Sequence, residues 1–391
     1  MDVDLTSDQD LLLQTTTRFI EAACPLTAVR QAISTGADAG ATGTDAGATG
    51  ATGPDAGAEY RRQAAELGWF AMLVPEELGG GRVSNNGLLD ASLIAEARGA
   101  GLQPGPFVGT NVVAHALAEE GSQDQQSKVL PLLLSGDESA TWAVAGSAAD
   151  GSPEAGVRAR RETGGYVLSG TKAFVQDAHR SAWILVTAAG DTGPAQFLVP
   201  ADATGVVIQR RDGLDLTRSF SEVRFEDAEV PAAALVGEYG GAAGLIERQL
   251  QIACVLTVAE SIGAMDRDFD VAVQYAKDRT AFGRPIGSFQ AMKHLLADTS
   301  LMLEMSKAMA GAAARAVGAR RPDAGLVASM AKAFVGDCGV DVAQNCFQTF
   351  GGIGYTWEHD QHLFLRRITT DAALYGDPTW HRERVCQLSG L

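Results

Sequence analysis

Positive charge is scarce in this sequence of 391 residues. It holds 31 lysine and arginine residues against 48 aspartate and glutamate residues, which gives a formal net charge of −17. A protein of this charge repels the phosphate backbone of nucleic acids, so we expect no nucleic-acid binding. An anionic ligand can still bind through local arginine side chains, although the overall field opposes its approach.

Long apolar runs and paired cysteines are also missing. No apolar run approaches the roughly 20 residues that a membrane-spanning helix needs, and the acidic start of the chain lacks the basic segment of a signal peptide. The five cysteines form no C-x-x-C pair, which is typical of reduced, mostly buried thiols in a cytosol. We therefore expect a cytoplasmic protein without a membrane span. The cysteines are Cys24, Cys254, Cys338, Cys346 and Cys386.

Several common catalytic motifs are absent as well. The sequence has neither the G-x-S-x-G turn of serine hydrolases nor the G-x-x-x-x-G-K-[ST] loop that cradles nucleotide phosphates. His359 and His362 lie in Glu-His-Asp-Gln-His, which matches neither H-E-x-x-H nor H-x-x-E-H. We therefore expect no metal site.

What is present is an alternation of helical and strand patterns in three blocks. Apolar residues recur at helical spacing up to about residue 135 and again after about residue 240. Between them lie short β-branched runs separated by Gly, Pro, Asp and Ser, as in antiparallel sheets. These patterns predict an α+β protein with a helical domain over 1–135, an antiparallel β-domain over 136–240 and a C-terminal four-helix bundle over 241–391.

Residues 36–58 differ from the rest of the first block. They consist almost entirely of Gly, Ala, Thr and Asp and carry no large apolar side chain. Such a segment cannot repay the entropy lost on ordering. We predict that it forms a flexible insertion at the surface.

The stretch 279–290 lies between two long helical patterns and reads Arg-Thr-Ala-Phe-Gly-Arg-Pro-Ile-Gly-Ser-Phe-Gln. Arg279 offers a planar fork of donors that suits a phosphate group. Gly283 and Gly287 allow close backbone approach, and Pro285 is expected to end the first helix. Taken alone, the arginine is better explained by an ion pair with a surface carboxylate.

The spacing Arg-x-x-Phe-Gly-x-x-Ile-x-x-x-Gln in this stretch resembles the flavin-binding signature of the acyl-CoA dehydrogenase family. Residues 348–355 resemble a second family motif, Gln-x-x-Gly-Gly-x-Gly-[Tyr/Phe], which meets the FAD pyrophosphate and adenosine of a neighbouring subunit. Residues 166–174 resemble the strand and turn just before the flavin ring, although an ordinary hairpin with a buried Phe is the alternative. The resemblance implies FAD contacts from Arg279, Phe282, Gln290, Gln348, Thr349, Phe350, Gly351, Gly352, Phe174 and Gln176.

The same resemblance implies α,β-dehydrogenation of an acyl-CoA thioester by a tetramer, either of one chain or of unlike chains. A carboxylate base removes the α-proton, and FAD passes the electrons to an electron-transfer flavoprotein. Most family members carry that base in Tyr-Glu-Gly-Thr after the last long helix, where this chain reads Leu-Tyr-Gly-Asp-Pro over 374–378. Asp377 is therefore our candidate catalytic residue. Glu247 and Glu260 match neither base position of the family, and we expect them to be solvated or ion-paired.

A second departure from the family lies at residues 141–150, which only loosely resemble the motif Thr-Glu-Pro-Gly-Ala-Gly-Ser-Asp. With the missing glutamate, this suggests one chain of an α2β2 assembly that shares its flavin site with an unlike chain. Three interpretations stay open: a dehydrogenase subunit, a non-catalytic partner that completes the FAD site, and a flavoenzyme of the same fold with different chemistry.

Overall fold

The computed structural model describes residues 5–34, 57–144 and 155–391, so almost all of the insertion predicted over 36–58 lies outside the described residues. The first described part is helical. Its first helix begins with the capping box predicted at Thr6 and Gln9, in which each side chain accepts from the backbone N–H of the other residue. The helices are α1 (Ser7–Ala23), α2 (Leu26–Ser34), α3 (Ala58–Glu66), α4 (Gly87–Ala100), α5 (Phe107–Glu120), α6 (Gln123–Lys128) and α7 (Leu130–Leu134).

The middle part is a sheet in the order β6-β7-β3-β2-β4-β5-β8, with β1 beside β4. The pairings of β1 and β2 with β4 are parallel, and the others are antiparallel. The strands are β1 (Ala140–Ala143), β2 (Val157–Glu162), β3 (Gly165–Gln176), β4 (Trp183–Gly190), β5 (Gly193–Pro200), β6 (Val206–Arg211), β7 (Phe220–Pro231) and β8 (Leu235–Val236).

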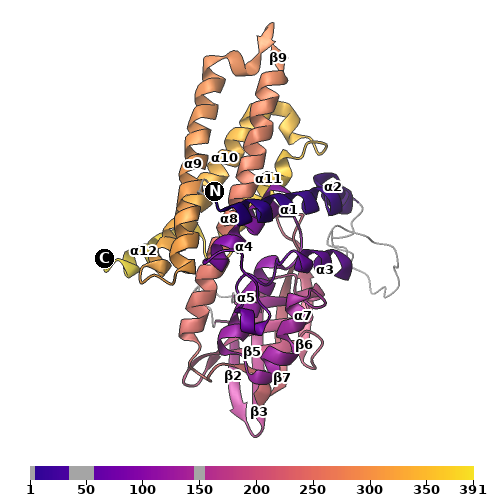
Figure 1. Cartoon of the computed structure of the whole chain (residues 1–391), viewed down its shortest axis with the longest axis vertical. Helices are drawn as coiled ribbons and strands as arrows, with labels where there is room; N and C mark the ends of the chain where they lie inside the picture. Colours follow the sequence, from indigo (N-terminus) through magenta and orange to yellow (C-terminus); the bar gives the residue numbers. More distant parts are fainter. Residues whose placement is uncertain (1–4, 35–56, 145–154) are drawn as a thin grey trace.

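The last part returns to helices, and the α+β architecture predicted from the patterns is confirmed. Figure 1 shows the long α8 and α9 side by side, with the sheet at the opposite end of the molecule from β9. The elements are α8 (Ala243–Asp278), β9 (Thr280–Ala281), β10 (Arg284–Pro285), α9 (Gln290–Gly318), α10 (Ala324–Phe350), α11 (Gln361–Ala373) and α12 (Pro378–Leu388).

Two local expectations need correction. The C-terminal part has a fifth helix, α12, which begins with Asp377 as N-cap and Pro378 at its first position. An Asp-Pro pair is typical of the start of a helix, so the sequence did contain a signal for α12. Pro285 does not end α8, because the helix already stops at Asp278 and Pro285 pairs with Thr280 in the β9–β10 hairpin.

One apolar core runs through all three parts. It includes Ile94 of α4, Trp142 of β1 and Ile252 of α8, each nearly inaccessible to solvent. Helices α4 and α8 approach unusually closely, since a Cβ on Gly99 would lie 1.9 Å from the Glu260 carbonyl oxygen. This packing ties the first part of the chain directly to the last. Within the described ranges, no helix is both long and apolar enough to cross a membrane.

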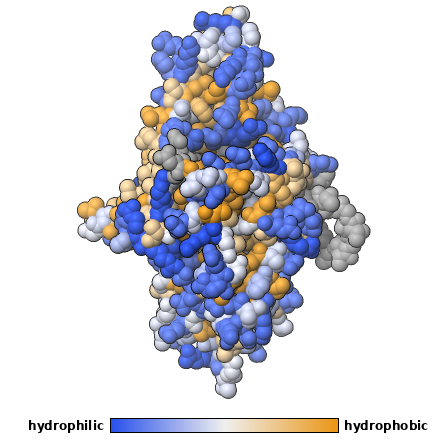
Figure 2. All heavy atoms as spheres, viewed as in Figure 1, coloured by the Kyte–Doolittle hydropathy of each residue, from blue (hydrophilic) through white to orange (hydrophobic). Residues whose placement is uncertain are grey.

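Apolar side chains also reach the surface. Figure 2 shows hydrophobic residues in scattered patches on a largely hydrophilic face. Leu301 and Met305 of α9 have 60% and 45% of their surface exposed. Exposed side chains of this size on a long helix are consistent with association between chains.

Candidate functional site

The tip of the α8–α9 connection is a two-residue hairpin turn. Ala281 pairs with Arg284, and the residues between them, Phe282 and Gly283, have φ angles of 54° and 78°. A turn with positive φ at both central positions suits the twist of a hairpin, but a bulky side chain adopts it only under strain. Phe282 is nevertheless there, with 96% of its surface exposed. A strained, exposed aromatic ring makes this tip a candidate for contact with a ligand or another chain.

Arg279 stands beside this turn, immediately after the last residue of α8. Its backbone is held at both ends, because its N–H donates to the Tyr275 carbonyl and its carbonyl accepts from Ile286, both at 2.8 Å. Its exposed guanidinium has no hydrogen-bond or ion-pair partner among the described residues. Gln290, the first residue of α9, is also exposed. Both side chains are therefore available to a ligand.

The second motif lies at the same end of the bundle. The ring of Phe350, at the end of α10, packs against Tyr275 of α8 with centroids 5.2 Å apart. Gln348 is exposed, whereas Phe350 is buried. Thr349 is also buried and donates to the Asn345 carbonyl of its own helix at 2.9 Å. The side chains of these two buried residues therefore support the loop from inside.

The glycines after α10 leave the backbone open. A Cβ built on Gly351 or on Gly352 would meet no described heavy atom within 4 Å. Gly351 also has a φ of 61°, a conformation that favours glycine. The peptide groups of this turn can thus be approached closely by a ligand.

Phe174 and Gln176 end strand β3. Phe174 has a φ of 51° at an irregularity in the β3–β7 register, and 68% of its surface is exposed, so the alternative of a buried hairpin Phe is wrong. The Gln176 carbonyl accepts from the Thr141 hydroxyl at 2.6 Å. Asp177, which follows, accepts from the Ser219 hydroxyl at 2.6 Å. The exposed Phe174 ring therefore lies at a strand end that hydrogen bonds hold in place.

The turn after α11 contains Asp377, which is exposed and caps α12 by accepting from the Trp380 N–H at 2.7 Å. Two residues earlier, the ring of Tyr375 stacks on Trp142 with centroids 6.1 Å apart and an interplanar angle of 17°. The sequence interpretation assigned no role to Tyr375. The sequence contains one signal for Tyr375: it directly precedes Gly376, and in the family motif the glutamate directly precedes the glycine.

A buried network of charges lies behind this turn. The Arg218 guanidinium, on the β6–β7 loop, pairs with Asp371 of α11 and with Glu260 of α8, and all three side chains are at most 3% exposed. Arg98 of α4 approaches Glu260 at 3.5 Å. Burial raises the pKa of Asp371 to about 6, against the lowering effect of Arg218. The network joins all three parts of the chain at one point.

Both carboxylates that we expected to be structural are ion-paired. Glu260 belongs to the buried network, and Glu247 pairs with Arg384 at 2.5 Å. Glu247 also accepts from Gln251 one turn along α8, at 2.7 Å. Neither carboxylate is free to serve as a base in this structure.

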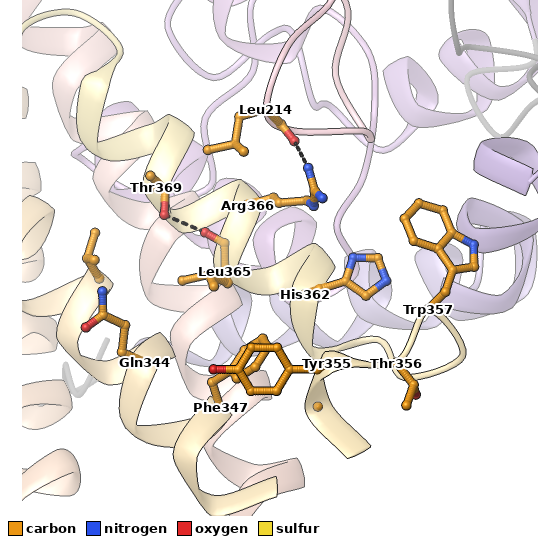
Figure 3. A pocket seen from close by; sticks show the side chains of 12 residues that line it. Leu214, Gln344, Phe347, Tyr355, Thr356, Trp357, His362, Leu365, Arg366 and Thr369 are labelled. Carbon is orange, nitrogen blue, oxygen red and sulfur yellow. Dashed lines mark hydrogen bonds between the residues drawn. The ribbon is translucent and has the colours of Figure 1, made fainter. Parts of the chain in front are cut away.

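A surface cavity of about 500 Å³ lies between α10 and α11 (Figure 3). Phe347, Tyr355 and Trp357 contribute aromatic walls, and Arg366 on its edge donates to the Leu214 carbonyl at 3.1 Å. Neither Arg279 nor Asp377 lines this cavity. This cavity is therefore next to the glycine loop but apart from the predicted base.

The predicted contacts form two separate groups. Arg279, Phe282 and the 348–352 loop share the end of the bundle that carries β9, whereas Phe174, Gln176 and Asp377 lie where the sheet meets the helices. Figure 1 shows β9 far from the sheet. A single chain therefore does not bring all of these residues around one ligand.

Comparison with known proteins identifies the class. The chain matches the models of the N-terminal, middle and C-terminal domains of acyl-CoA dehydrogenases at residues 28–137, 143–228 and 242–387. It is 30% identical over 320 residues to an acyl-CoA dehydrogenase of Bacillus subtilis (strain 168), covering 78% of this chain and 82% of that protein. The chain belongs to the acyl-CoA dehydrogenase family, whose members are oxidoreductases that act on the CH–CH bond of acyl-CoA thioesters.

Solved structures show the same fold at lower identity. A glutaryl-CoA dehydrogenase of Mycobacterium smegmatis in complex with FADH2 superposes with a TM-score of 0.86 at 20% identity, covering 100% of this chain and 97% of that chain. The ChsE4-ChsE5 complex of Mycobacterium tuberculosis gives a TM-score of 0.86 at 24% identity, covering 100% and 99% of the two chains.

Proposed function

We propose that this chain is an FAD-binding subunit of an acyl-CoA dehydrogenase, that it works with a second, unlike chain, and that the pair dehydrogenates an acyl-CoA thioester. Family membership supports the reaction class. A site shared between two chains is supported by the turn after α11. In this turn Tyr375 packs on Trp142 and Asp377 serves as a helix cap. In this proposal the unlike chain contributes the base, and an electron-transfer flavoprotein accepts the electrons.

The exposed residues of the chain fit FAD. Arg279 would neutralise the pyrophosphate with charge-assisted hydrogen bonds, and Phe282 would pack on adenosine-side groups. Gln290 and Gln348 would donate hydrogen bonds, and the open backbone at 351–352 would approach the phosphates. At the sheet, Phe174 and Gln176 would lie against the flavin ring. FAD, when bound, supplies the electron sink.

The separation of these two groups supports a cofactor held between chains. The hairpin end of one chain would complete the flavin site that begins at the sheet of its neighbour, which also explains the exposed, strained Phe282. A solved complex of two differently named chains, ChsE4 and ChsE5, shares the fold and makes an unlike neighbour a reasonable partner.

The test is to produce the chain alone and together with a candidate sibling that carries the family's glutamate. We expect FAD absorbance in the pair, bleaching of that absorbance by acyl-CoA, and electron transfer to an electron-transfer flavoprotein. The chain alone should not bleach. Bleaching by the chain alone, at the rate of the pair, would refute the shared site.

A second candidate is an autonomous dehydrogenase that uses Asp377 as base. It is favoured by the exposure of Asp377 and by its position two residues after Tyr375. Asp377→Asn keeps the shape of the side chain and removes the base. Under this alternative the chain alone turns over, and the substitution leaves flavin bound but oxidised when acyl-CoA is added.

A further inference from the structure

Asp177 lies directly after the strand end that would face the flavin, and it is a buried acid without an ion pair. Its side chain is 1% exposed, and no cationic side chain of the described ranges pairs with it. Its backbone has a φ of 53°, and Phe174, three residues earlier, has a φ of 51°. Left-handed backbone at non-glycine residues is uncommon and is concentrated at functional sites. Asp177 is therefore a candidate for a function that its burial alone does not explain.

Both oxygens of the Asp177 carboxylate accept hydrogen bonds. Oδ1 accepts from the Ser219 hydroxyl at 2.6 Å, and Oδ2 accepts from the side-chain NH2 of Gln176 at 3.2 Å. Burial raises the pKa of this carboxyl, whereas the two hydrogen bonds and the charges of Arg218 and Arg98 act in the opposite direction. Two donors and two nearby guanidinium groups suit the ionised form of the carboxylate.

An ionised carboxylate decides which way the Gln176 amide points, because it accepts hydrogen bonds and donates none. Only the NH2 group of Gln176 can face Asp177, so the amide oxygen points away from it. This oxygen has no hydrogen-bond partner among the described residues, and the Gln176 side chain is only half-buried. The strand end thus presents a free acceptor to a ligand that lies against it.

The carboxylate is itself held in place by the buried charge network. Ser219 directly follows Arg218, which pairs with Glu260 and Asp371. The Ser219 carbonyl also accepts from the Asp177 N–H at 2.9 Å, so both the backbone and the side chain of Asp177 are bonded to one residue. The network therefore fixes the position of the group that orients the amide.

We propose that Asp177 is a positioning residue that turns the amide oxygen of Gln176 towards the flavin, where this oxygen accepts a hydrogen bond from a ring N–H. This inference rests on the proposed function and deepens it, because it names what regulates the reduction potential at that site. Reduction adds an N–H group to a flavin ring. An acceptor at this place therefore stabilises the reduced form relative to the oxidised form and raises the reduction potential.

The experiment is a double-mutant cycle on the FAD-loaded assembly, and it measures the reduction potential of the bound flavin. Asp177→Asn keeps the shape of the side chain and tolerates the left-handed φ, but it replaces one carboxylate oxygen by an NH2 group. The Ser219 hydroxyl should hold the remaining oxygen, because the opposite arrangement leaves this buried hydroxyl without an acceptor. The new NH2 then faces Gln176 and reverses its amide.

Gln176→Met supplies the second background of the cycle, because it removes the amide and keeps a side chain of similar length. In that background Asp177→Asn only removes a negative charge, whereas beside Gln176 it also replaces an acceptor at the flavin by a donor. We expect the effect of Asp177→Asn to differ between the backgrounds by about tenfold in the affinity ratio of reduced to oxidised flavin. This is about 30 mV for a two-electron couple, with the lower potential where Gln176 is present.

Two single variants complete the design. Gln176→Met alone should lower the potential, since it removes an acceptor, and this test does not depend on the folding of the Asn variant. Asp202→Asn is the matched control, because it removes a negative charge from an exposed residue outside this hydrogen-bond chain, and it should leave the potential unchanged. Circular dichroism establishes that each variant is folded.

The outcomes separate the inference from the proposed function. Equal effects of Asp177→Asn in the two backgrounds, or a rise in potential in Gln176→Met, would overturn the orienting role of Asp177 and leave the flavin at the sheet. If Gln176→Met changes neither flavin content nor potential, the flavin does not lie against this strand end, and the inference fails with that contact. If the wild-type assembly holds no FAD, the proposed function itself fails.

Discussion

The rings of Tyr275 and Phe350 meet with centroids 5.2 Å apart. Tyr275 lies one helical turn before Arg279, and Phe350 directly precedes Gly351. This one contact therefore joins the two motifs that resemble flavin-binding signatures, although they are far apart along the chain. It holds the hairpin and the glycine loop at the same end of the helical bundle.

Arg279→Ala should weaken FAD retention and leave the fold intact, since its exposed guanidinium has no partner among the described residues. Losing a hydrogen bond to a charged group costs about 1.5–3 kcal/mol, or roughly a 10- to 100-fold loss of flavin affinity. The flavin-to-protein ratio and the melting temperature of the purified assembly measure the two effects. Lys277→Ala, at the exposed end of the same helix, is the control. Full flavin content in the Arg279 variant would contradict the assignment.

Substitutions of Asp377 separate capping from catalysis. Asparagine caps a helix about as well as aspartate, whereas alanine costs about 1 kcal/mol. If Asp377 serves only as the cap of α12, Asp377→Asn should preserve both stability and turnover of the pair, and Asp377→Ala should lose only stability. Denaturant unfolding and steady-state rates measure both. Loss of turnover in the Asn variant with unchanged stability would identify Asp377 as the base.

Arg218→Met should be strongly destabilising. Its removal leaves Asp371 and Glu260 buried without their cationic partner, and breaking a buried pair in this way costs about 3–5 kcal/mol. Arg382→Met is the control, because it breaks an exposed pair with Asp337 that is worth about 0–1 kcal/mol. Urea unfolding of both variants gives the comparison. Similar losses from the two substitutions would show that the buried network is not a major source of stability.

Stability should fall with acidification in part because of His381. Burial, together with the charge of Lys332, lowers the pKa of His381 to about 3 in the folded chain, against an ordinary value of 6.5. Between these values the unfolded chain binds the additional proton, so the free energy of unfolding decreases as pH falls. The contribution is fully present above about pH 6.5 and changes by at most about 1.4 kcal/mol per pH unit.

The measurement for His381 is the difference in unfolding free energy between the wild type and His381→Gln across pH 4 to 8. Other titrating groups affect both proteins and largely cancel in this difference. We expect the wild type to lose stability relative to the variant below about pH 6.5. A difference independent of pH would show that the folded pKa of His381 is close to its ordinary value.

The candidate site illustrates which features short sequence motifs predict and which they do not. The motifs led us to predict FAD contacts at Arg279, Phe282 and the glycine loop, because flavin-binding signatures are short runs whose spacing is visible in one stretch of chain. A motif does not show which of its side chains are buried. Thr349 and Phe350 were therefore included among the predicted FAD contacts, although their side chains face the interior. Phe174 was predicted for the same reason as Arg279, by its position in a motif, and its ring is exposed.

The sequence by itself determined the class of fold, the order of helices and strands, the cap at Thr6 and the two flavin-like motifs. Each depends on periodicity or on neighbours within a few residues. Only the tertiary structure decided that Tyr375 stacks on Trp142, that Arg218 pairs with Glu260 and Asp371, and that the predicted contacts divide into two groups. These relationships join residues far apart in the chain, and they depend on how closely α8, α11 and the sheet pack, which no local pattern specifies.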